Sequence, residues 1–382
     1  MLRTTTVFGW IGITVGVLLY AGCSSRGAGG GADAAVSSGS GGASASGGSV
    51  APSDSGGSSP AGSGGSDSGG SSGVIDAGMS TGSGGAAADA PPAVDSPTAS
   101  PDVPQTACTA GTLKPGNTTL MIPSGGAMRS YIVHVPPMYD GKTRLPLVVD
   151  MHGAGDTAAH QITWSGWREK ADAVGIVVVY PQGIGNTWNG GPNDCPLTVC
   201  CCNPAQSMKI DDMAFIRALV AKMAQDGCID LKRVYATGLS NGGIMSQWLA
   251  CGASHIFAGV APVSGPNMIM DCKLSRPLSV VLYRGRMDVG VLYNGGTPPG
   301  GNHTWPSAMA DFDRWGTLDK CTDAPVAMPM HPVCQIRSKC EGGVEVVLCS
   351  PNAPHNLYGT VMSQMVGVAD VAWEIFQRHP LP

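Results

Sequence analysis

The stretch RVYATGLSNGGIMSQW at residues 233–248 has the pattern of a β-strand that turns directly into a helix. Its first half is β-branched and apolar, which predicts a buried strand, and its second half continues with a helical pattern. Residues 238–242 read Gly-Leu-Ser-Asn-Gly and match G-x-S-x-G, in which small residues let the backbone close tightly around a serine. The same letters surround Ser71 and Ser80, but no strand or helix pattern flanks either one. Ser240 is therefore the candidate nucleophile, and an ordinary glycine-rich turn is the alternative.

Apolar runs alternate with helical patterns over most of the chain. Predicted strands lie at residues 130–135, 145–151, 175–180, 233–240, 257–264, 277–283 and 344–349. Predicted helices lie at residues 211–227, 241–253, 307–318 and 368–379. Several of the strands are apolar throughout, as strands buried on both faces of a sheet are. This alternation predicts an α/β fold with a mostly parallel central sheet flanked by helices.

Three segments of different composition divide the chain. Residues 1–23 combine Arg3 with an apolar run and end in Ala-Gly-Cys, which predicts a signal peptide with a lipoprotein-type cleavage site. Lipid would then be attached to Cys23, and an ordinary secretion signal is the alternative. Residues 24–107 are rich in Gly, Ser and Ala with few large apolar side chains, so we expect a disordered linker. Residues 108–382 are long enough for one large folded domain.

Charge and cysteine content narrow the possible functions of that domain. The chain has a net charge of −5, and most of the excess acid lies in the linker, so the domain is near neutral and gives no electrostatic basis for binding nucleic acid. Of the 13 cysteines, all but Cys23 lie between Cys108 and Cys349, which predicts a framework of up to six disulfides in an exported protein. The spacing Val-Cys-Cys-Cys at residues 199–202 does not match a zinc site, so we expect no metal. Contact with a membrane is expected only through lipid on Cys23, and the protein is taken to be a monomer.

An acid and a histidine are expected on loops that follow later strands than the one carrying Ser240. Asp288 follows the predicted strand at 277–283 and is the candidate acid. His355 lies between the last predicted strand and the last predicted helix and is the candidate base. His303, in the segment Asn-His-Thr-Trp-Pro, is the competing histidine, and its alternative is a loop residue at the edge of a substrate site.

Two backbone N–H groups are candidates for stabilising a negatively charged oxygen. Asn241 follows Ser240 at the predicted start of a helix, and Ala154 lies in a His-Gly-Ala-Gly loop after a buried strand. His152 begins that loop and is expected to orient it, with general base as the competing role.

Together these segments resemble one family, the exported esterases of the α/β-hydrolase fold that are grouped as feruloyl esterases and polyhydroxybutyrate depolymerases. The resemblance covers about residues 112–380. It rests on the segments HGAG, YPQGIGNTWNGG followed by CCNPA, DDMAFIRALV, RVYATGLSNGGIMSQWLAC, RGRMDVGVLYNGG and FDRWGTLDKC. The resemblance implies that Ser240 is the nucleophile, Asp288 the acid and His355 the base, and that no cofactor is needed.

Two loops depart from the family pattern. The acid loop usually reads His-Gly-Thr-x-Asp and continues to Pro-Tyr, whereas this chain has Arg284 at the start and Leu292 in place of the proline, with Tyr293 retained. The base usually lies in Gly-Gly-His-Thr-Trp-Pro, whereas residues 352–359 lack the tryptophan. Similar letters occur instead at residues 302–306, where the family has only the approach to a helix.

The expected function is that of a secreted serine esterase of the cell envelope that releases hydroxycinnamoyl (feruloyl) or acetyl groups from plant polysaccharide. Hydrolysis of poly- or oligo-3-hydroxybutyrate is the first alternative, and a catalytically inactive surface-binding module is the second. Trp188 is a candidate for stacking on an aromatic acyl group or a sugar, or is a buried structural residue. Tyr293 and His303 are the other candidate substrate-binding residues.

Overall fold

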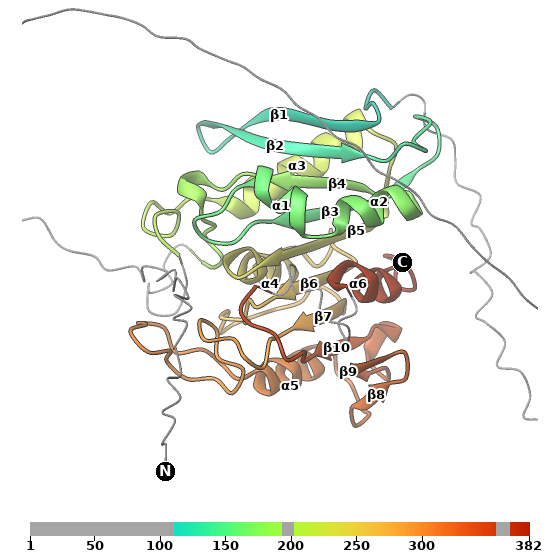
Figure 1. Ribbon diagram of the computed structural model, residues 1–382. Helices are drawn as coiled ribbons and strands as arrows, with labels where there is room; N and C mark the ends of the chain where they lie inside the picture. The colour runs from blue at the N-terminus through green and yellow to red at the C-terminus, as the bar shows by residue number, and fades with distance from the viewer. Residues whose placement is uncertain (1–107, 109–110, 193–201, 357–366) are drawn as a thin grey trace, which may run out of the picture. The chain divides into compact units, whose positions relative to one another are not determined.

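The computed structural model describes residues 108, 111–192, 202–356 and 367–382. The predicted signal peptide, Cys23 and the predicted linker lie outside these residues. Figure 1 shows the described part as a central sheet with helices packed against it. The strands are β1 (Gly116–Ser124), β2 (Ala127–Val135), β3 (Leu145–Met151), β4 (Val177–Pro181), β5 (Ile229–Leu239), β6 (Gly259–Val263), β7 (Ser279–Tyr283), β8 (Val326–Met328), β9 (His331–Arg337) and β10 (Val346–Cys349).

The sheet has ten strands in the order β1-β2-β4-β3-β5-β6-β7-β10-β9-β8. The neighbours from β4 to β10 in this order all pair in parallel. Antiparallel strands β2 and β1 extend one edge, and β9 and β8 extend the other. Every residue of β4, β6, β7 and β10 is buried, as expected for strands covered on both faces. This arrangement confirms the predicted α/β-hydrolase fold with a mostly parallel sheet.

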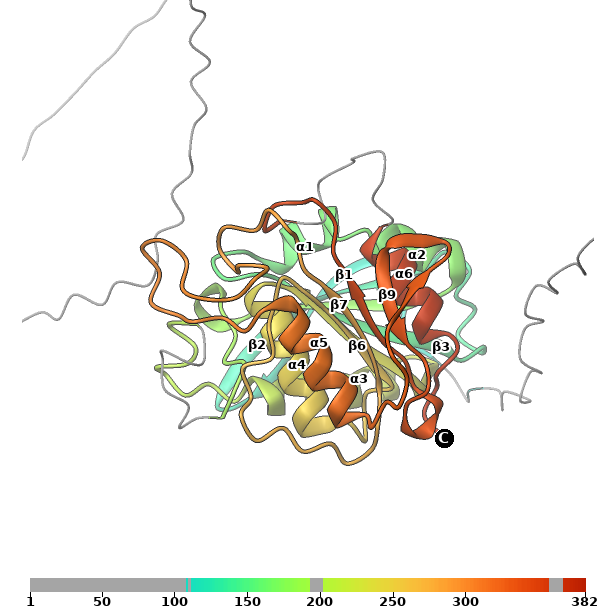
Figure 2. The same ribbon diagram turned by 90° about the horizontal axis from the view of Figure 1, so that it is seen from below.

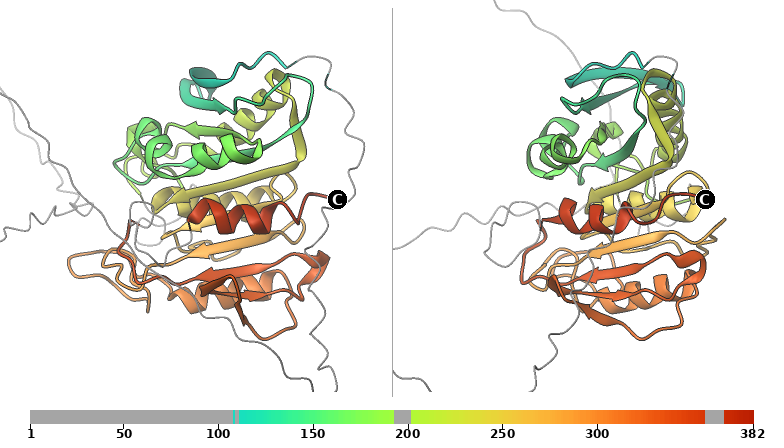
Figure 3. Two further views of the ribbon diagram at one scale, coloured as in Figure 1. Left: turned by 45° about the vertical axis from the view of Figure 1, so that its right-hand side comes forward. Right: turned by 90° about the vertical axis from the view of Figure 1, so that its right-hand side faces the viewer.

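Two layers of helices cover the sheet. The α-helices are α1 (Ala158–Trp164), α2 (Trp167–Val174), α3 (Asp212–Asp226), α4 (Asn241–Ala253), α5 (Ala308–Leu318) and α6 (Val368–Phe376), and the 3-10 helices are η1 (Ile184–Asn186) and η2 (Glu341–Gly343). Helices α3, α4 and α5 pack on one face of the sheet, and α1, α2 and α6 pack on the other (Figures 2 and 3). The four predicted helices correspond to α3 to α6, whereas the sequence patterns did not predict α1 or α2. None of the helices in the described residues has the length and apolar character needed to cross a membrane.

Disulfides join pairs of cysteines across the described domain. They join Cys108 to Cys228, Cys251 to Cys272, Cys321 to Cys340, and Cys334 to Cys349. Cys202 is also disulfide-bonded. The bond between Cys334 and Cys349 joins residues that lie directly opposite each other on β9 and β10. These bonds confirm the expected disulfide framework for the described cysteines and are typical of a protein from an oxidising compartment.

The turn between β5 and α4 holds Ser240 in a strained backbone conformation. Its φ is 55° and its ψ is −116°, a combination that costs a residue with a side chain about 1–3 kcal/mol. The backbone N–H of Ser240 donates to the oxygen of Val263 at 2.7 Å, so pairing between β5 and β6 continues up to the turn. The structure therefore has the predicted strand–turn–helix geometry around Ser240.

Gly238 and Gly242 bring this turn directly against the end of β3. A Cβ atom on Gly238 would lie 2.5 Å from the backbone oxygen of Met151. A Cβ atom on Gly242 would lie 2.2 Å from that oxygen and 2.6 Å from the backbone oxygen of His152. Because the obstructing atoms belong to backbone, a larger residue would displace the strand end itself. The two glycines thus hold the Ser240 turn against the loop that follows β3.

Replacing Gly242 with alanine should lower the free energy of unfolding by about 3 kcal/mol, because the new methyl group overlaps two backbone oxygens. Gly252→Ala in the same helix is the matched control, since its Cβ would meet the terminal methyl group of Met213, which can move. Urea denaturation should show a change of less than about 1 kcal/mol for the control. Equal destabilisation by the two substitutions would contradict the close packing of the turn.

Candidate active site

Loops from several parallel strands meet at the end of the sheet that carries Ser240. A Cβ atom on Gly153, which follows β3, would lie 3.7 Å from the Cβ of Ser240. The hydroxyl of Ser264, which follows β6, donates to the backbone oxygen of His355 at 3.0 Å. Figure 1 shows the loop between β7 and α5, which carries Asp288, at the same end of the sheet as the segment that follows β10. The fold therefore collects the candidate nucleophile, acid and base in one region.

Asp288 and His355 form a directly bonded pair. The Nδ1 atom of His355 lies 2.8 Å from Oδ2 of Asp288, whose side chain is 1% exposed, compared with 32% for the histidine. The other carboxylate oxygen accepts the backbone N–H groups of Gly290 at 2.8 Å and Val291 at 2.7 Å. A carboxylate bonded in this way holds the imidazole with its proton on Nδ1 and leaves Nε2 to accept one.

Several contacts act on the pKa of the Asp288 carboxyl. Burial acts to raise this pKa, but the hydrogen bond and charge of His355 and the N–H groups of Val291 and Gly290 together hold it below its ordinary value. The carboxylate is therefore ionised over the whole neutral pH range, as a partner for an imidazolium must be.

Further hydrogen bonds join the acid loop, which carries Asp288, to the base loop, which carries His355. The Tyr293 hydroxyl lies 2.9 Å from the Ser350 hydroxyl, and the Arg286 guanidinium lies over the Tyr293 ring at 4.7 Å. Arg286 Nε donates to the backbone oxygen of Ser350 at 3.1 Å, and the Met287 N–H donates to the backbone oxygen of Ala353 at 3.1 Å. Tyr293 thus braces the two loops through its hydroxyl, and its ring is partly buried.

Arg284, where the resembled family has histidine, is buried at the start of the acid loop. Its Nη2 atom donates to the backbone oxygens of Leu292 at 3.3 Å and Pro306 at 3.2 Å. Its Nη1 atom lies 3.5 Å from Oδ2 of Asp311, and the two side chains are 1% and 0% exposed. The sequence patterns did not predict this pair, because Asp311 lies inside the helical pattern at residues 307–318. The signal in the sequence is its spacing, since Asp311 is three residues after Ala308 and four before Trp315, on the apolar side of that pattern.

The Asn-His-Thr-Trp-Pro segment at residues 302–306 is hydrogen-bonded to the acid loop. The Trp305 indole N–H donates to the backbone oxygen of Gly290 at 2.8 Å, and His303 stacks on Trp305 with ring centroids 5.0 Å apart. Trp305 also packs with Ile244, Met268 and Val291 in a small apolar cluster. The structure thus brings His355, and not His303, to the carboxylate of Asp288.

The loop after β3 is held by a buried histidine. His152 Nδ1 lies 2.8 Å from the backbone oxygen of Gly153, and its Nε2 accepts the N–H of Gly183 at 3.0 Å. Burial lowers the pKa of His152 and favours its neutral form. With both ring nitrogens bonded to backbone, His152 orients the loop that carries Ala154, as expected.

Trp188 is fully buried and bonds to both the loop after β3 and the start of α4. Its indole N–H donates to the backbone oxygen of His152 at 2.9 Å. Its backbone N–H donates to Oδ1 of Asn241 at 2.6 Å, and Nδ2 of Asn241 donates back to its oxygen at 2.9 Å. With 0% of Trp188 exposed, the structure favours the buried structural alternative over stacking on a substrate. Among the described residues, no group of three or more His, Cys, Asp or Glu side chains is arranged to hold a metal ion.

The sheet and the Ser240 turn together have the α/β-hydrolase fold, and comparisons with known proteins agree with this fold. A family profile described as "Prolyl oligopeptidase family" matches residues 205–276. The chain is 29% identical over 269 residues to feruloyl esterase B of Piromyces equi, covering 66% of this chain and 46% of the relative. It is 30% identical over 165 residues to a bifunctional acetylxylan esterase/xylanase of Neocallimastix patriciarum, covering 43% of this chain and 22% of the relative.

A solved structure also resembles the chain. An acetyl xylan esterase from Aspergillus awamori has a TM-score of 0.49 and 13% identity, and the match covers 68% of this chain and 98% of that one. The chain spans about half the length, or less, of the curated relatives named above. The sequence matches confirm the resemblance to esterases of the α/β-hydrolase type.

The ionised state of Asp288 predicts a specific pH dependence of stability. Because its pKa is lower in the folded protein than in the unfolded chain, its stabilising effect is present above the unfolded-state pKa and is lost as the pH falls through the folded-state value. The difference in unfolding free energy between wild type and Asp288→Asn should therefore be larger near pH 6 than near pH 3 in urea denaturation.

Asp271→Asn is the control for this measurement, because Asp271 is 78% exposed and pairs with Lys273 at the surface. Exposed pairs contribute little to stability, so this variant should follow the wild type at both pH values. A difference for Asp288→Asn that does not change with pH would show that its carboxylate is not stabilised in the folded protein.

Proposed function

We propose that this protein is a serine carboxylic-ester hydrolase in which Ser240, His355 and Asp288 act together. The observation that carries the proposal is the bond between His355 Nδ1 and the buried Asp288 carboxylate, beside a strained serine turn. His355 Nε2 takes the proton from the Ser240 hydroxyl as the serine oxygen bonds to the ester carbonyl carbon. The same imidazolium then protonates the departing alkoxide as the ester C–O bond breaks.

Water completes the proposed cycle. His355 removes a proton from water as the oxygen of that water attacks the acyl-enzyme, and it returns the proton to Ser240 as the acid leaves. In both steps the backbone N–H groups of Asn241 and Ala154 stabilise the negatively charged oxygen. Losing one such donor typically costs about 3–4 kcal/mol of transition-state stabilisation. The proposed steps use groups of this chain, the ester and water.

The proposed substrates are hydroxycinnamoyl or acetyl esters of plant polysaccharide. This choice is supported by the names of the relatives, feruloyl esterase B and acetylxylan esterase/xylanase. The apolar cluster of Ile244, Met268, Val291 and Trp305 is proposed to lie next to the acyl group, since Ile244 is in the first turn after Ser240 and the Val291 N–H donates to Asp288. His303 stacks on this cluster through Trp305 and is proposed to lie at its substrate-facing edge.

We propose that the catalytic domain spans residues 108–382, that residues 1–23 direct export and that residues 24–107 tether the domain to lipid on Cys23. The domain boundary is supported by the bond between Cys108 and Cys228 and by the N–H of Thr112, which donates to the oxygen of Asp226 at 2.6 Å. The disulfides are consistent with a location outside the reducing cytosol. The protein is proposed to act as a monomer.

The assignment of the base predicts unequal effects of two histidine substitutions. His355→Ala should lower kcat/KM on p-nitrophenyl acetate by about 10³-fold to 10⁴-fold, because it removes the proposed proton acceptor for Ser240. Ser240→Ala removes the proposed nucleophile and should lower kcat/KM by a similar factor. His303→Ala should change the rate by only a few-fold. Full activity of His355→Ala would overturn the assignment. A folded wild-type protein without turnover would favour an inactive surface-binding module.

The proposed substrate class predicts an order of rates on three esters. Methyl ferulate or acetylated xylan should be hydrolysed faster than poly-3-hydroxybutyrate when released acid is measured at equal enzyme concentration. Ser240→Ala is the control for hydrolysis that does not depend on the site. Fastest release from the polyester would instead identify a depolymerase of hydroxybutyrate polymers.

A further inference from the structure

One buried residue bonds to both segments that carry the proposed oxyanion donors. The Trp188 indole N–H donates to the backbone oxygen of His152, two residues before Ala154. The Trp188 backbone exchanges two hydrogen bonds with the side chain of Asn241, whose own N–H is the other proposed donor. The two donors come from different elements, the loop after β3 and the start of α4, and Trp188 connects them through side chain and backbone.

The segment that carries Trp188 also packs tightly on α4. A Cβ atom on Gly190 would lie 2.8 Å from Cγ2 of Ile244 and 3.3 Å from the backbone nitrogen of Met245. The side chain of Asn241 bonds the Trp188 backbone in the way that a neighbouring β-strand would. The first turn of α4 therefore has little freedom to shift relative to this segment.

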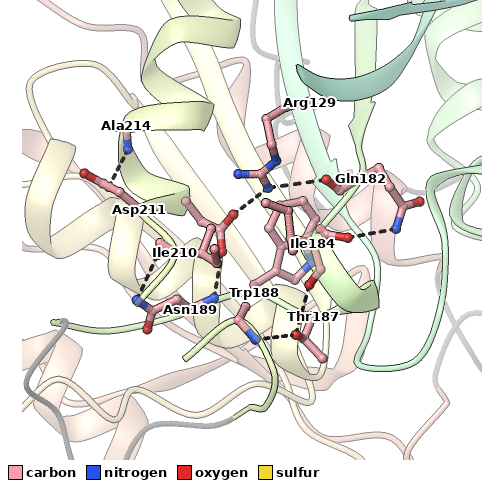
Figure 4. Close-up of polar contacts among 12 residues, drawn as sticks. Arg129, Gln182, Ile184, Thr187, Trp188, Asn189, Ile210, Asp211 and Ala214 are labelled. Atoms are coloured by element: carbon pink, nitrogen blue, oxygen red, sulfur yellow. Dashed lines mark hydrogen bonds and ion pairs between the residues drawn. The ribbon is translucent and has the colours of Figure 1, made fainter. Parts of the chain in front are cut away.

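A buried ion pair anchors the same segment on its other side. Figure 4 shows Arg129 of β2 reaching toward the segment formed by Trp188 and Asn189. Arg129 Nη2 lies 2.6 Å from Oδ1 of Asp212, and Oδ2 of Asp212 accepts the N–H of Asn189 at 2.8 Å. Asn189 Nδ2 donates to the backbone oxygen of Ile210 at 2.9 Å, and the Arg129 and Asp212 side chains are 3% and 0% exposed.

This anchor suits a positional role better than a purely stabilising one. Burying two charges removes them from water, and a buried ion pair gives little net stability compared with apolar residues of similar size. Its directional bonds nevertheless fix Asp212, and through it the backbone at Asn189, in one place. The chain of contacts thus runs from Arg129 through Asp212 and Asn189 to Trp188.

We propose that Trp188 is a positioning residue that sets the distance between the Ala154 and Asn241 N–H groups. Donors of this kind act only when both lie about 2.7–3.1 Å from the developing oxyanion, so a small separation of the two segments removes most of their effect. Trp188 acts through His152 and Asn241 and does not touch the substrate, in keeping with its complete burial. The inference rests on the proposed function as an ester hydrolase.

The test compares Trp188→Phe with wild type in the full chain. Phenylalanine keeps an aromatic ring but is smaller than the indole and lacks its N–H, which frees the backbone oxygen of His152 and the loop after it. Rates on p-nitrophenyl acetate are expressed per reactive serine, counted by titration with a fluorophosphonate, so misfolded protein does not enter the comparison. We expect kcat/KM per reactive serine to fall about 10-fold to 100-fold.

A transition-state analogue separates positioning from a general structural role. A trifluoromethyl ketone adds to Ser240 to give a hemiketal whose oxyanion occupies the same place as that of the reaction. Its inhibition constant should rise by the same factor as kcat/KM falls. Trp167→Phe is the matched control, because Trp167 is also fully buried but its indole contacts Phe376 at the α6 side of the sheet. This control should change stability only and leave the rate per reactive serine unaltered.

A second variant keeps the shape of the side chain in case phenylalanine prevents folding. Incorporation of β-(3-benzothienyl)alanine at position 188 replaces the N–H by sulfur and preserves the packing. Both variants at the wild-type rate per reactive serine, or an unchanged inhibition constant, would overturn the positioning role. Wild-type protein that neither reacts with the fluorophosphonate nor hydrolyses the ester would overturn the proposed function itself, and the inference with it.

Discussion

The contact between the Ser240 turn and the end of β3 is the constraint on which the rest of the site depends. Two glycines allow backbone to meet backbone at a distance that no side chain would permit. The strain at Ser240 persists because β5, β6 and α4 hold the residues on both sides of it. Once the turn is fixed there, every other group of the site has to reach it from a loop at the same end of the sheet.

The acid and base loops meet this requirement with bonds made in part by residues that depart from the resembled family pattern. Arg284 replaces a histidine and holds two backbone oxygens of the surrounding loops while pairing with Asp311. Arg286 and Tyr293 then join the acid loop to Ser350 at the start of the base loop. The residues that differ from the family pattern thus belong to a connected set of contacts around the bonded pair of Asp288 and His355.

Elements with a strong local pattern were predictable from the sequence. The buried parallel strands and α3 to α6 have long apolar or capped patterns, and Ser240 and His355 follow from their positions relative to them. Edge strands β1, β8 and β9 lack such runs, and most residues of β1 and β8 are exposed to solvent. Helices α1 and α2 are short, so few turns repeat their pattern. The pairing of Arg284 with Asp311 and the orientation of Trp188 depend on contacts between distant segments, which local patterns do not contain.

The separation of Trp305 from His355 has a consequence for how such a protein can diversify. In the family pattern, one short segment supplies both the base and the neighbouring tryptophan, so a change in either affects the other. Here His355 and Trp305 lie in two different segments, and each side chain has its own hydrogen bond to the loop that carries Asp288. Mutation and selection can therefore alter the segment that carries Trp305 while the bond between His355 and Asp288 is kept.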